Sequence, residues 1–212
     1  MSNLKKILIA DDHAIFREGL KQVISKSSIM TVAAEAENGM EVLKKVRENH
    51  FDVVVLDISM PGRNGLDILS DIKSIRPKVP VLILSMHPEE QFAVRAFRAG
   101  AAGYVTKGSP PHELLEALER VALGKKYISP SLADVIVTSL DLSNQKEPHR
   151  DLSNREYQVF CMIASGKPVG KIAEELSLSV KTISTYRANI LRKMNLGNNA
   201  EITRYTIENK LI

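Results

Sequence analysis

Five short apolar runs, each the length of one buried strand, recur through the first half of the chain and are separated by amphipathic stretches. Several runs are hydrophobic without interruption, which is typical of parallel strands that helices cover on both faces. The stretches between them are long enough for the helical crossovers that parallel strands require. This alternation predicts a doubly wound α/β domain with a five-stranded parallel sheet. The expected strands are Lys6–Ala10, Met30–Ala34, Val53–Leu56, Val81–Leu84 and Gly103–Val105, and the expected helices include Gly39–Asn49, Leu66–Ile75, Glu89–Ala99 and Pro111–Leu123.

The pattern changes after residue 124. A polar stretch over residues 143–150, preceded by a short helical segment near Leu132–Leu140, reads as a linker. Beyond it no strand pattern appears, and the remaining residues predict four short helices. A chain of 212 residues is long enough for two domains. We therefore expect an α/β domain at residues 5–123, a linker at 124–148 and a small all-α domain at 149–212.

Composition limits where such a chain works. Hydrophobic residues make up 44% and charged residues 25%, which is ordinary for a globular protein. No stretch reaches the roughly 18 uninterrupted apolar residues of a membrane helix, and the first residues lack the pattern of a signal sequence. These features predict a cytoplasmic protein without a membrane partner.

Polar residues stand where the predicted strands end. Asp11 and Asp12 follow the first strand, Asp57 the third and Ser85 the fourth, while Lys107 comes shortly after the fifth. In a doubly wound sheet the carboxyl ends of the strands converge on one pocket, so these residues should meet. Three close carboxylates repel one another unless a cation neutralises them, and Mg²⁺ suits oxygen ligands and phosphoryl groups. The sequence predicts a magnesium site where Asp57 is the nucleophile for an acyl phosphate, which Lys107 and Ser85 contact.

Each of these residues also has a plain structural explanation. An aspartate after a strand often caps the next helix, and Asp11 or Asp12 could cap a helix that starts near Ala14. Lys107 could be a solvated loop lysine, and Ser85 could cap a turn. For any one residue alone, the functional interpretation is not favoured over the structural one. The coincidence of five such residues at the expected strand ends favours the functional interpretation.

The segments around these residues resemble the CheY-like receiver family over residues 5 to about 123. The resemblance rests on the acidic pair, on Val-Val-Leu-Asp57-Ile-Ser-Met-Pro61-Gly62, on Ser85, and on Gly-Tyr104-Val-Thr-Lys107. It implies a flavodoxin-like sheet. It also implies that Asp57 accepts a phosphoryl group from a histidine kinase or from a small donor such as acetyl phosphate.

The resemblance further implies a role for each site residue. Asp12, Asp57 and the carbonyl of Ser59 would bind Mg²⁺ directly, whereas Asp11 would act largely through water. Ser85 and Tyr104 would form a switch that responds to the phosphoryl group. Tyr104 could equally be a packing residue, because aromatic residues at strand ends commonly are.

A phosphatase is the enzymatic alternative. Haloacid-dehalogenase-type phosphatases also use a strand-end aspartate with Mg²⁺, but they place a second aspartate two residues further on. Here that position is Ser59. Asp57 is therefore expected to store a phosphoryl group in a protein that is not an enzyme, with at most slow self-phosphorylation and self-dephosphorylation.

The C-terminal residues contain a helix, a tight turn and a second helix over Val180–Met194. The second helix contains four basic residues and no acidic one. A buried apolar stripe and an exposed face of short polar and basic residues suit the major groove of DNA. A protein-binding helical module would fit the periodicity equally well. The residues expected to face inward are Val180, Ile183, Ile190, Leu191 and Met194.

This region, about residues 149–212, resembles the LuxR-type helix-turn-helix, and the whole chain resembles the NarL/FixJ class of response regulators. The resemblance rests on Leu152-Ser-Asn-Arg-Glu156, Lys171-Ile-Ala-Glu-Glu-Leu and the Ser179–Met194 segment. It implies double-stranded DNA as a partner and a homodimer that forms on phosphorylation. The residues expected to contact DNA are Lys181, Thr182, Ser184, Thr185, Arg187, Ala188, Arg192 and Lys193.

Two features leave parts of this resemblance open. Val169-Gly170-Lys171 replaces the usual Asn-Lys-Glu, and Tyr186 stands where histidine is frequent. The first difference puts the backbone contacts of the preceding helix in doubt.

The last helix, about Ala200–Asn209, would supply a dimer surface by resemblance, although its apolar residues Ile202, Tyr205 and Ile207 could serve only the domain core.

Overall fold

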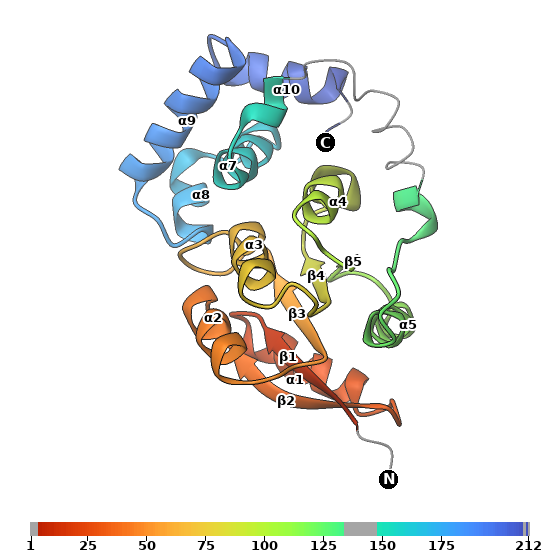
Figure 1. Ribbon diagram of the computed structural model, residues 1–212. Coiled ribbons are helices and arrows are strands. Elements are labelled where there is room, and N and C mark those ends of the chain that lie inside the picture. Colours follow the sequence, from red (N-terminus) through yellow and green to blue (C-terminus); the bar gives the residue numbers. More distant parts are fainter. Residues whose placement is uncertain (1–3, 134–147, 210, 212) are drawn as a thin grey trace. The chain divides into compact units, whose positions relative to one another are not determined.

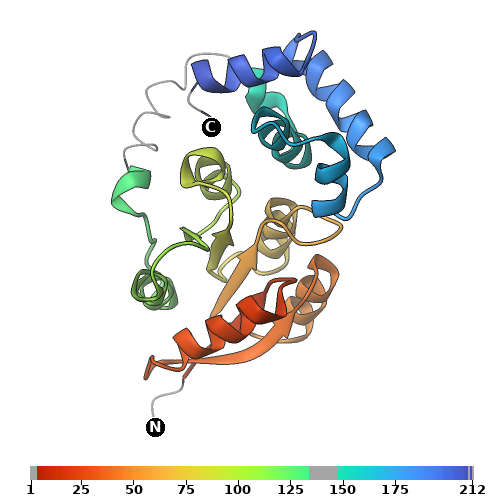
Figure 2. The ribbon, with the colours of Figure 1, turned by 180° about the vertical axis from the view of Figure 1, so that it is seen from behind.

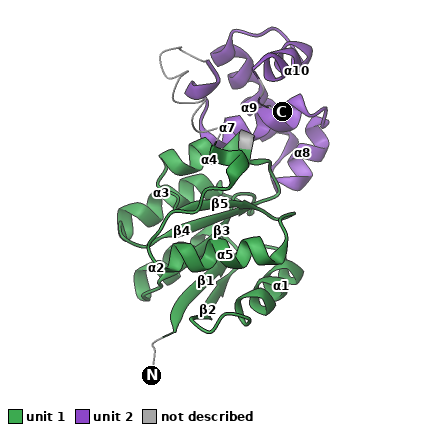
Figure 3. Ribbon diagram, turned by 90° about the vertical axis from the view of Figure 1, so that its right-hand side faces the viewer, with its two compact units in different colours: residues 1–134 green, residues 135–212 purple. Residues whose placement is uncertain are grey.

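The computed structural model describes residues 4–133, 148–209 and 211. The chain forms two compact units, residues 1–134 and 135–212, which Figure 3 draws in green and purple. Residues 130–133 are helical, as expected for the start of the helix predicted near Leu132–Leu140. The rest of that helix, and most of the polar linker, lie outside the described residues.

The first unit is built on a five-stranded parallel sheet in the order β2-β1-β3-β4-β5. This order confirms the predicted doubly wound fold. Figures 1 and 2, whose colours follow the sequence, show strands and helices alternating from red to green and helices alone from cyan to blue. The strands are β1 (Lys5–Ala10), β2 (Met30–Ala36), β3 (Val53–Asp57), β4 (Val81–Ser85) and β5 (Gly103–Thr106).

Helices cover both faces of the sheet. On one face α1 packs against α5, and α2 packs against α3 elsewhere in the unit; Figure 3 shows α1 and α5 in front of the strands. Every residue of β3 and β4 is buried, which explains why these runs are apolar without alternation. The helices are α1 (Ala14–Ile24), α2 (Gly39–Glu48), α3 (Gly65–Ile75), α4 (Glu89–Arg98) and α5 (Pro111–Ala122).

The described part of the second unit is helical, with a short 3₁₀ turn and four helices. Ser153 and Glu156 form a reciprocal capping box at the start of α7, as their spacing predicts. Among the described helices of the chain, none has both the length and the apolar character needed to cross a bilayer. The elements are η2 (Pro148–Asp151), α7 (Asn154–Ala164), α8 (Val169–Glu175), α9 (Val180–Met194) and α10 (Asn199–Glu208).

The buried stripe of α9 is narrower than the sequence predicts. Ile183, Ile190 and Met194 are buried, but Val180 is 55% exposed and Leu191 is half-buried. At about 100° per residue, Val180 and Leu191 lie roughly 60° and 80° from the centre of the stripe. The prediction that Val180 faces inward was therefore wrong.

The α10 residues that could serve the domain core also differ in their exposure. Ile202 is fully buried, Tyr205 is half-buried and Ile207 is 61% exposed. Ile207 therefore does not serve the core, and an apolar side chain lies on the surface of α10.

Candidate functional site

Acidic side chains gather at the carboxyl edge of the sheet. Asp11 and Asp12 follow β1, and Asp57 is the last residue of β3. Ligand atoms of these three residues and of His13 all lie within 4.8 Å of one another. Asp11 and Asp57 are buried, whereas Asp12 is half-buried. The structure thus brings together the three carboxylates that the sequence placed at separate strand ends.

Lys107 lies against two of these carboxylates. Its Nζ donates a hydrogen bond to Asp57 Oδ2 at 2.8 Å and lies 2.6 Å from Asp11 Oδ2. The ammonium also stands over the ring of Phe16, 4.7 Å from its centroid. Only 4% of the Lys107 side chain is exposed, so Lys107 is not a solvated loop residue.

The single ammonium group of Lys107 does not neutralise the three carboxylates of the cluster. Burial and the nearby Asp11 raise the pKa of Asp57 above its usual value, although Lys107 opposes the shift. Burial alone would lower the pKa of Lys107, but the carboxylates of Asp57 and Asp11 raise it. Lys107 therefore stays charged, and ionised Asp57 carries an energetic penalty in a pocket that has more carboxylates than ammonium groups.

The donor set fits a hard divalent cation. Asp11 Oδ2 and Asp12 Oδ1 are buried, and within the described residues neither accepts a hydrogen bond of good geometry. Lys107 Nζ lies 2.6 Å from Asp11 Oδ2, and His13 Nδ1 lies 3.0 Å from Asp12 Oδ1. Buried carboxylate oxygens in this state favour a bound cation, and Mg²⁺ prefers one or two carboxylates together with water.

Replacing Asp57 by asparagine should stabilise the metal-free protein at neutral pH. Because the folded pKa is raised, the penalty of ionised Asp57 is full above that pKa and disappears as the pH falls toward the value of a free aspartate. Lys107 keeps Asp11 as a partner. We expect Asp57→Asn to raise the free energy of unfolding by on the order of 1 kcal/mol. Calorimetry in chelator should show this gain at pH 7.5 and a smaller gain at lower pH. An equal gain at both values would contradict the assigned cause.

The loop after Asp57 is held close to the strand. The amide of Ser59 donates to Asp57 Oδ1 at 3.1 Å. Gly65, at the start of α3, packs so tightly that a Cβ there would lie 2.3 Å from the carbonyl oxygen of Asp57 and 2.6 Å from Ile58 Cα. Only glycine permits this approach. The glycine therefore brings α3 against the end of β3 and helps fix the position of Asp57.

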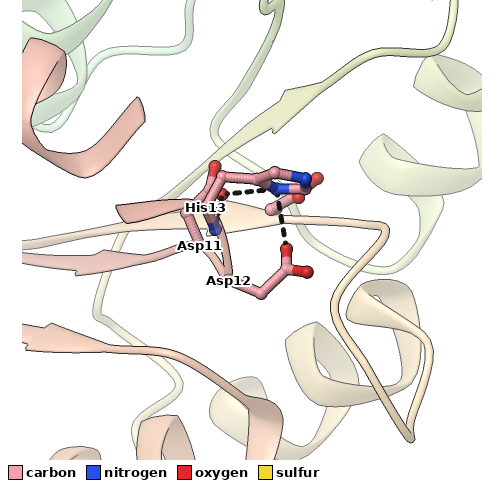
Figure 4. Close-up of side chains that lie close together, drawn as sticks. Asp11, Asp12 and His13 are labelled. Carbon is pink, nitrogen blue, oxygen red and sulfur yellow. Dashed lines mark hydrogen bonds and ion pairs between the residues drawn. The ribbon is translucent and has the colours of Figure 1, made fainter. Parts of the chain in front are cut away.

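Sequence reasoning missed two residues at this site. His13 lies beside both acids, with Nδ1 3.3 Å from Asp11 Oδ1 (Figure 4). Arg17, which is 7% exposed, donates from Nη1 to the carbonyl oxygen of Asp11 at 2.7 Å and pairs with Glu35 and Glu37. The position of His13 next to the acidic pair was a readable signal. The sequence around Arg17 contains no such signal, because the side chain of a helical arginine is ordinarily solvated.

The predicted switch residues meet at His87. The amide of His87 donates to Ser85 Oγ at 3.0 Å, and the hydroxyl of Tyr104 donates to the His87 carbonyl at 2.9 Å. Ser85 and Tyr104 are both fully buried. His87 Nε2 also lies 3.3 Å from Ser59 Oγ. One loop after β4 therefore connects the two predicted switch residues with the loop that follows Asp57.

One face of α9 is exposed and carries several of the residues that the sequence predicted to contact DNA. Both basic and short polar side chains lie on it at helical spacing, and no acidic residue occurs in the helix. The hydroxyls of Ser184 and Thr185 donate to carbonyls one turn earlier, at 2.9 and 3.0 Å. The exposed residues of the stripe are Lys181, Ser184, Thr185, Ala188 and Arg192.

The other predicted contacts are engaged within the unit. Arg187 is half-buried and donates from Nε to Asn199 Oδ1 at 2.6 Å, which holds its guanidinium against α10. Thr182 is half-buried and its hydroxyl lies 2.8 Å from Ser179 Oγ. Lys193 pairs with Glu156 at 2.6 Å. Lys193 therefore ties α9 to α7 and is a weaker candidate for a DNA contact.

Two family models match the chain. Residues 7–119 match the response regulator receiver domain, and residues 150–206 match the luxR family of bacterial regulatory proteins. Among curated relatives, the oxygen regulatory protein NreC of Staphylococcus carnosus is 36% identical over 98% of this chain and 99% of its own. The response regulator UvrY of Escherichia coli is 34% identical over 97% and 94%.

A solved structure of a regulator is also similar to nearly the whole chain. RcsB of Salmonella enterica serovar Typhimurium, bound to promoter P1flhDC in the presence of phosphomimetic BeF₃⁻, aligns with a TM-score of 0.61. The two chains are 25% identical, and the alignment covers 96% of this chain and 98% of RcsB.

Proposed function

This chain belongs to the response regulators that join a receiver domain to a luxR-type DNA-binding domain, and we propose that Asp57 is the residue whose phosphorylation controls its binding to DNA. Proteins of this family receive a phosphoryl group on an aspartate from a histidine kinase, which controls DNA binding and transcription. The observation that carries the proposal is the buried Asp57 carboxylate, 2.8 Å from Lys107 Nζ and beside two further acids.

Each residue has a distinct part in this proposal. Asp57 attacks the phosphorus of the donor, and the bond from phosphorus to the leaving oxygen or nitrogen breaks as the acyl phosphate forms. Lys107 is placed to pair with a phosphoryl oxygen. Asp12, Asp57 and the Ser59 carbonyl would hold Mg²⁺, with Asp11 acting largely through water. When bound, Mg²⁺ would offset the negative charge of the acids and the phosphoryl group.

In this proposal Asp57 stores a phosphoryl group. Ser59 occupies the position two residues on, where a phosphatase would place a general acid or base. We therefore propose slow self-phosphorylation from small donors and slow self-dephosphorylation, without turnover of other substrates. Because the output is binding to chromosomal DNA, we place the protein in the cytoplasm.

The exposed stripe of α9 is the proposed DNA surface. Its short side chains allow close approach to base edges, and Lys181 and Arg192 can contact phosphates. We propose that the phosphorylated chain binds a two-fold site as a homodimer, since operator symmetry follows protein symmetry in helix-turn-helix regulators. α10, with Ile207 exposed, is the proposed dimer surface.

Magnesium should stabilise the wild-type protein and permit phosphorylation. A ligand that binds only the folded state adds about 2.7 kcal/mol at 100 times its Kd. We expect Mg²⁺ to raise the melting temperature of the wild type and to permit a phosphoryl mass gain from acetyl phosphate. Asp12→Asn should lose most of both effects. Asp71→Asn, at an acid of α3 that pairs with Arg63 and is not part of the acidic cluster, is the control. Equal behaviour of Asp12→Asn and wild type would refute the assigned magnesium site.

A further inference from the structure

A buried carboxylate at the start of α4 holds the segment that follows α5. Glu89 is the first residue of α4 and is 8% exposed. Its Oε2 accepts hydrogen bonds from Ser129 Oγ at 2.5 Å and from Ser131 Oγ at 2.8 Å. Ser129, which is 4% exposed, also accepts a hydrogen bond from the amide of Leu132 at 3.1 Å. We call Glu89, Ser129 and Ser131 the Glu89 cluster.

A general helix effect does not account for this arrangement. An acid in the first turn of a helix is favourable because the amide groups there carry partial positive charge. An exposed side chain suffices for that effect, and burying a carboxylate costs free energy unless it is hydrogen-bonded. Glu89 is instead buried against hydroxyls 40 and 42 residues away. The contacts therefore join two parts of the unit.

One of these parts is the loop that carries the switch residues. Only Pro88 separates Glu89 from His87, whose amide and carbonyl bind Ser85 and Tyr104. The His87 ring also stacks on Phe92 of α4, with centroids 4.6 Å apart. A rearrangement of Ser85 and Tyr104 is therefore expected to shift the backbone that positions Glu89.

The other part is the beginning of the linker toward the second unit. Tyr127 docks this segment on the sheet: its amide donates to the Ala102 carbonyl at 2.9 Å, and its hydroxyl donates to Glu113 of α5 at 3.1 Å. Ser129 then accepts from the Leu132 amide, at the start of the helical residues 130–133. Beyond Tyr127, the contacts of the Glu89 cluster attach the segment to α4.

We propose that Glu89 is a positioning residue that couples the switch loop to the linker: movement of residues 85–88 on phosphorylation reaches residues 129–133 through the Glu89 cluster. This inference rests on the proposed phosphorylation of Asp57. It adds a specific route by which the effect of phosphorylation reaches the end of the first unit. Tyr127 holds the same segment through α5 and takes no part in the coupling.

Hydrogen exchange of the full chain, measured by mass spectrometry, tests the coupling. Wild type, Glu89→Ala, the double variant Ser129→Ala/Ser131→Ala and the control Tyr127→Phe would each be measured with and without acetyl phosphate and Mg²⁺. The double variant leaves α4 intact, so the test survives if Glu89→Ala folds poorly. Intact mass reports whether each protein carries the phosphoryl group.

We expect phosphorylation to change the exchange of residues 129–133 by about tenfold in wild type and Tyr127→Phe, which corresponds to the loss of about one hydrogen bond. The change should be absent in the other two variants, while residues 85–88 still respond. A wild-type-sized change at 129–133 in those variants, or none in phosphorylated wild type, overturns the coupling but leaves Asp57 as the acceptor. A wild type that gains no phosphoryl mass overturns the proposed function, and the coupling with it.

Discussion

The Asp57→Ala variant is expected to bind DNA with the same affinity before and after treatment with acetyl phosphate and Mg²⁺, whereas the affinity of the wild type rises about 5- to 150-fold, the usual range for coupling between two sites. The reason is that alanine removes the carboxylate that forms the acyl phosphate but leaves α9 unchanged. The measurement is fluorescence anisotropy with a duplex selected from a random pool by the phosphorylated wild type.

The matched control for this experiment is Asp71→Ala. Asp71 is a half-buried acid of α3 that pairs with Arg63 at 2.6 Å and is not part of the acidic cluster. It should respond to acetyl phosphate as the wild type does. A gain in affinity by Asp57→Ala as large as that of the wild type would show that another residue, or no phosphorylation at all, controls DNA binding.

The second large effect is expected at the exposed stripe of α9. Lys181→Ala and Arg192→Ala should each weaken binding several-fold to any duplex, because contacts to phosphates are independent of sequence. Each should also reduce the slope of log affinity against log salt by about 1. Titration of a mixed-sequence duplex over a range of salt concentrations measures both quantities.

Arg120→Ala is the control for these variants, because Arg120 is an exposed arginine of α5 that lies near Glu116, outside α9 and α10. Its affinity and salt slope should match the wild type. If all three variants have the affinity and the salt slope of the wild type, the DNA surface lies elsewhere, and the alternative of a protein-binding helical module regains support. Arg187 is a less direct probe, because Asn199 holds its guanidinium.

The regular parts of the fold were predictable because their signals are local. The apolar runs of β3 and β4 predict buried parallel strands, and Ser153 with Glu156 predicts the start of α7. A doubly wound sheet places the carboxyl ends of β1 and β3 side by side at one edge, so the meeting of Asp11, Asp12 and Asp57 could also be predicted from the sequence.

Long-range side-chain contacts were not predictable in the same way. The pairing of Arg17 with the Asp11 carbonyl and of Glu89 with Ser129 depends on how helices and loops pack, which periodicity does not specify. Val180 was wrongly predicted to face inward because a stripe of apolar residues on a helix has a width, and in α9 only the centre of the stripe is buried. The sequence likewise gave no sign that Lys193, a predicted DNA contact, pairs with Glu156.

The most direct test of the account is to locate the phosphoryl group on the wild-type chain. Peptide mass spectrometry after treatment with acetyl phosphate and Mg²⁺, under conditions that preserve acyl phosphates, would assign the modified residue. We predict that the group lies on Asp57, that it is missing without Mg²⁺, and that it is missing in Asp57→Ala. A phosphoryl group on any other residue of the wild type, or none on Asp57, would contradict the central claim.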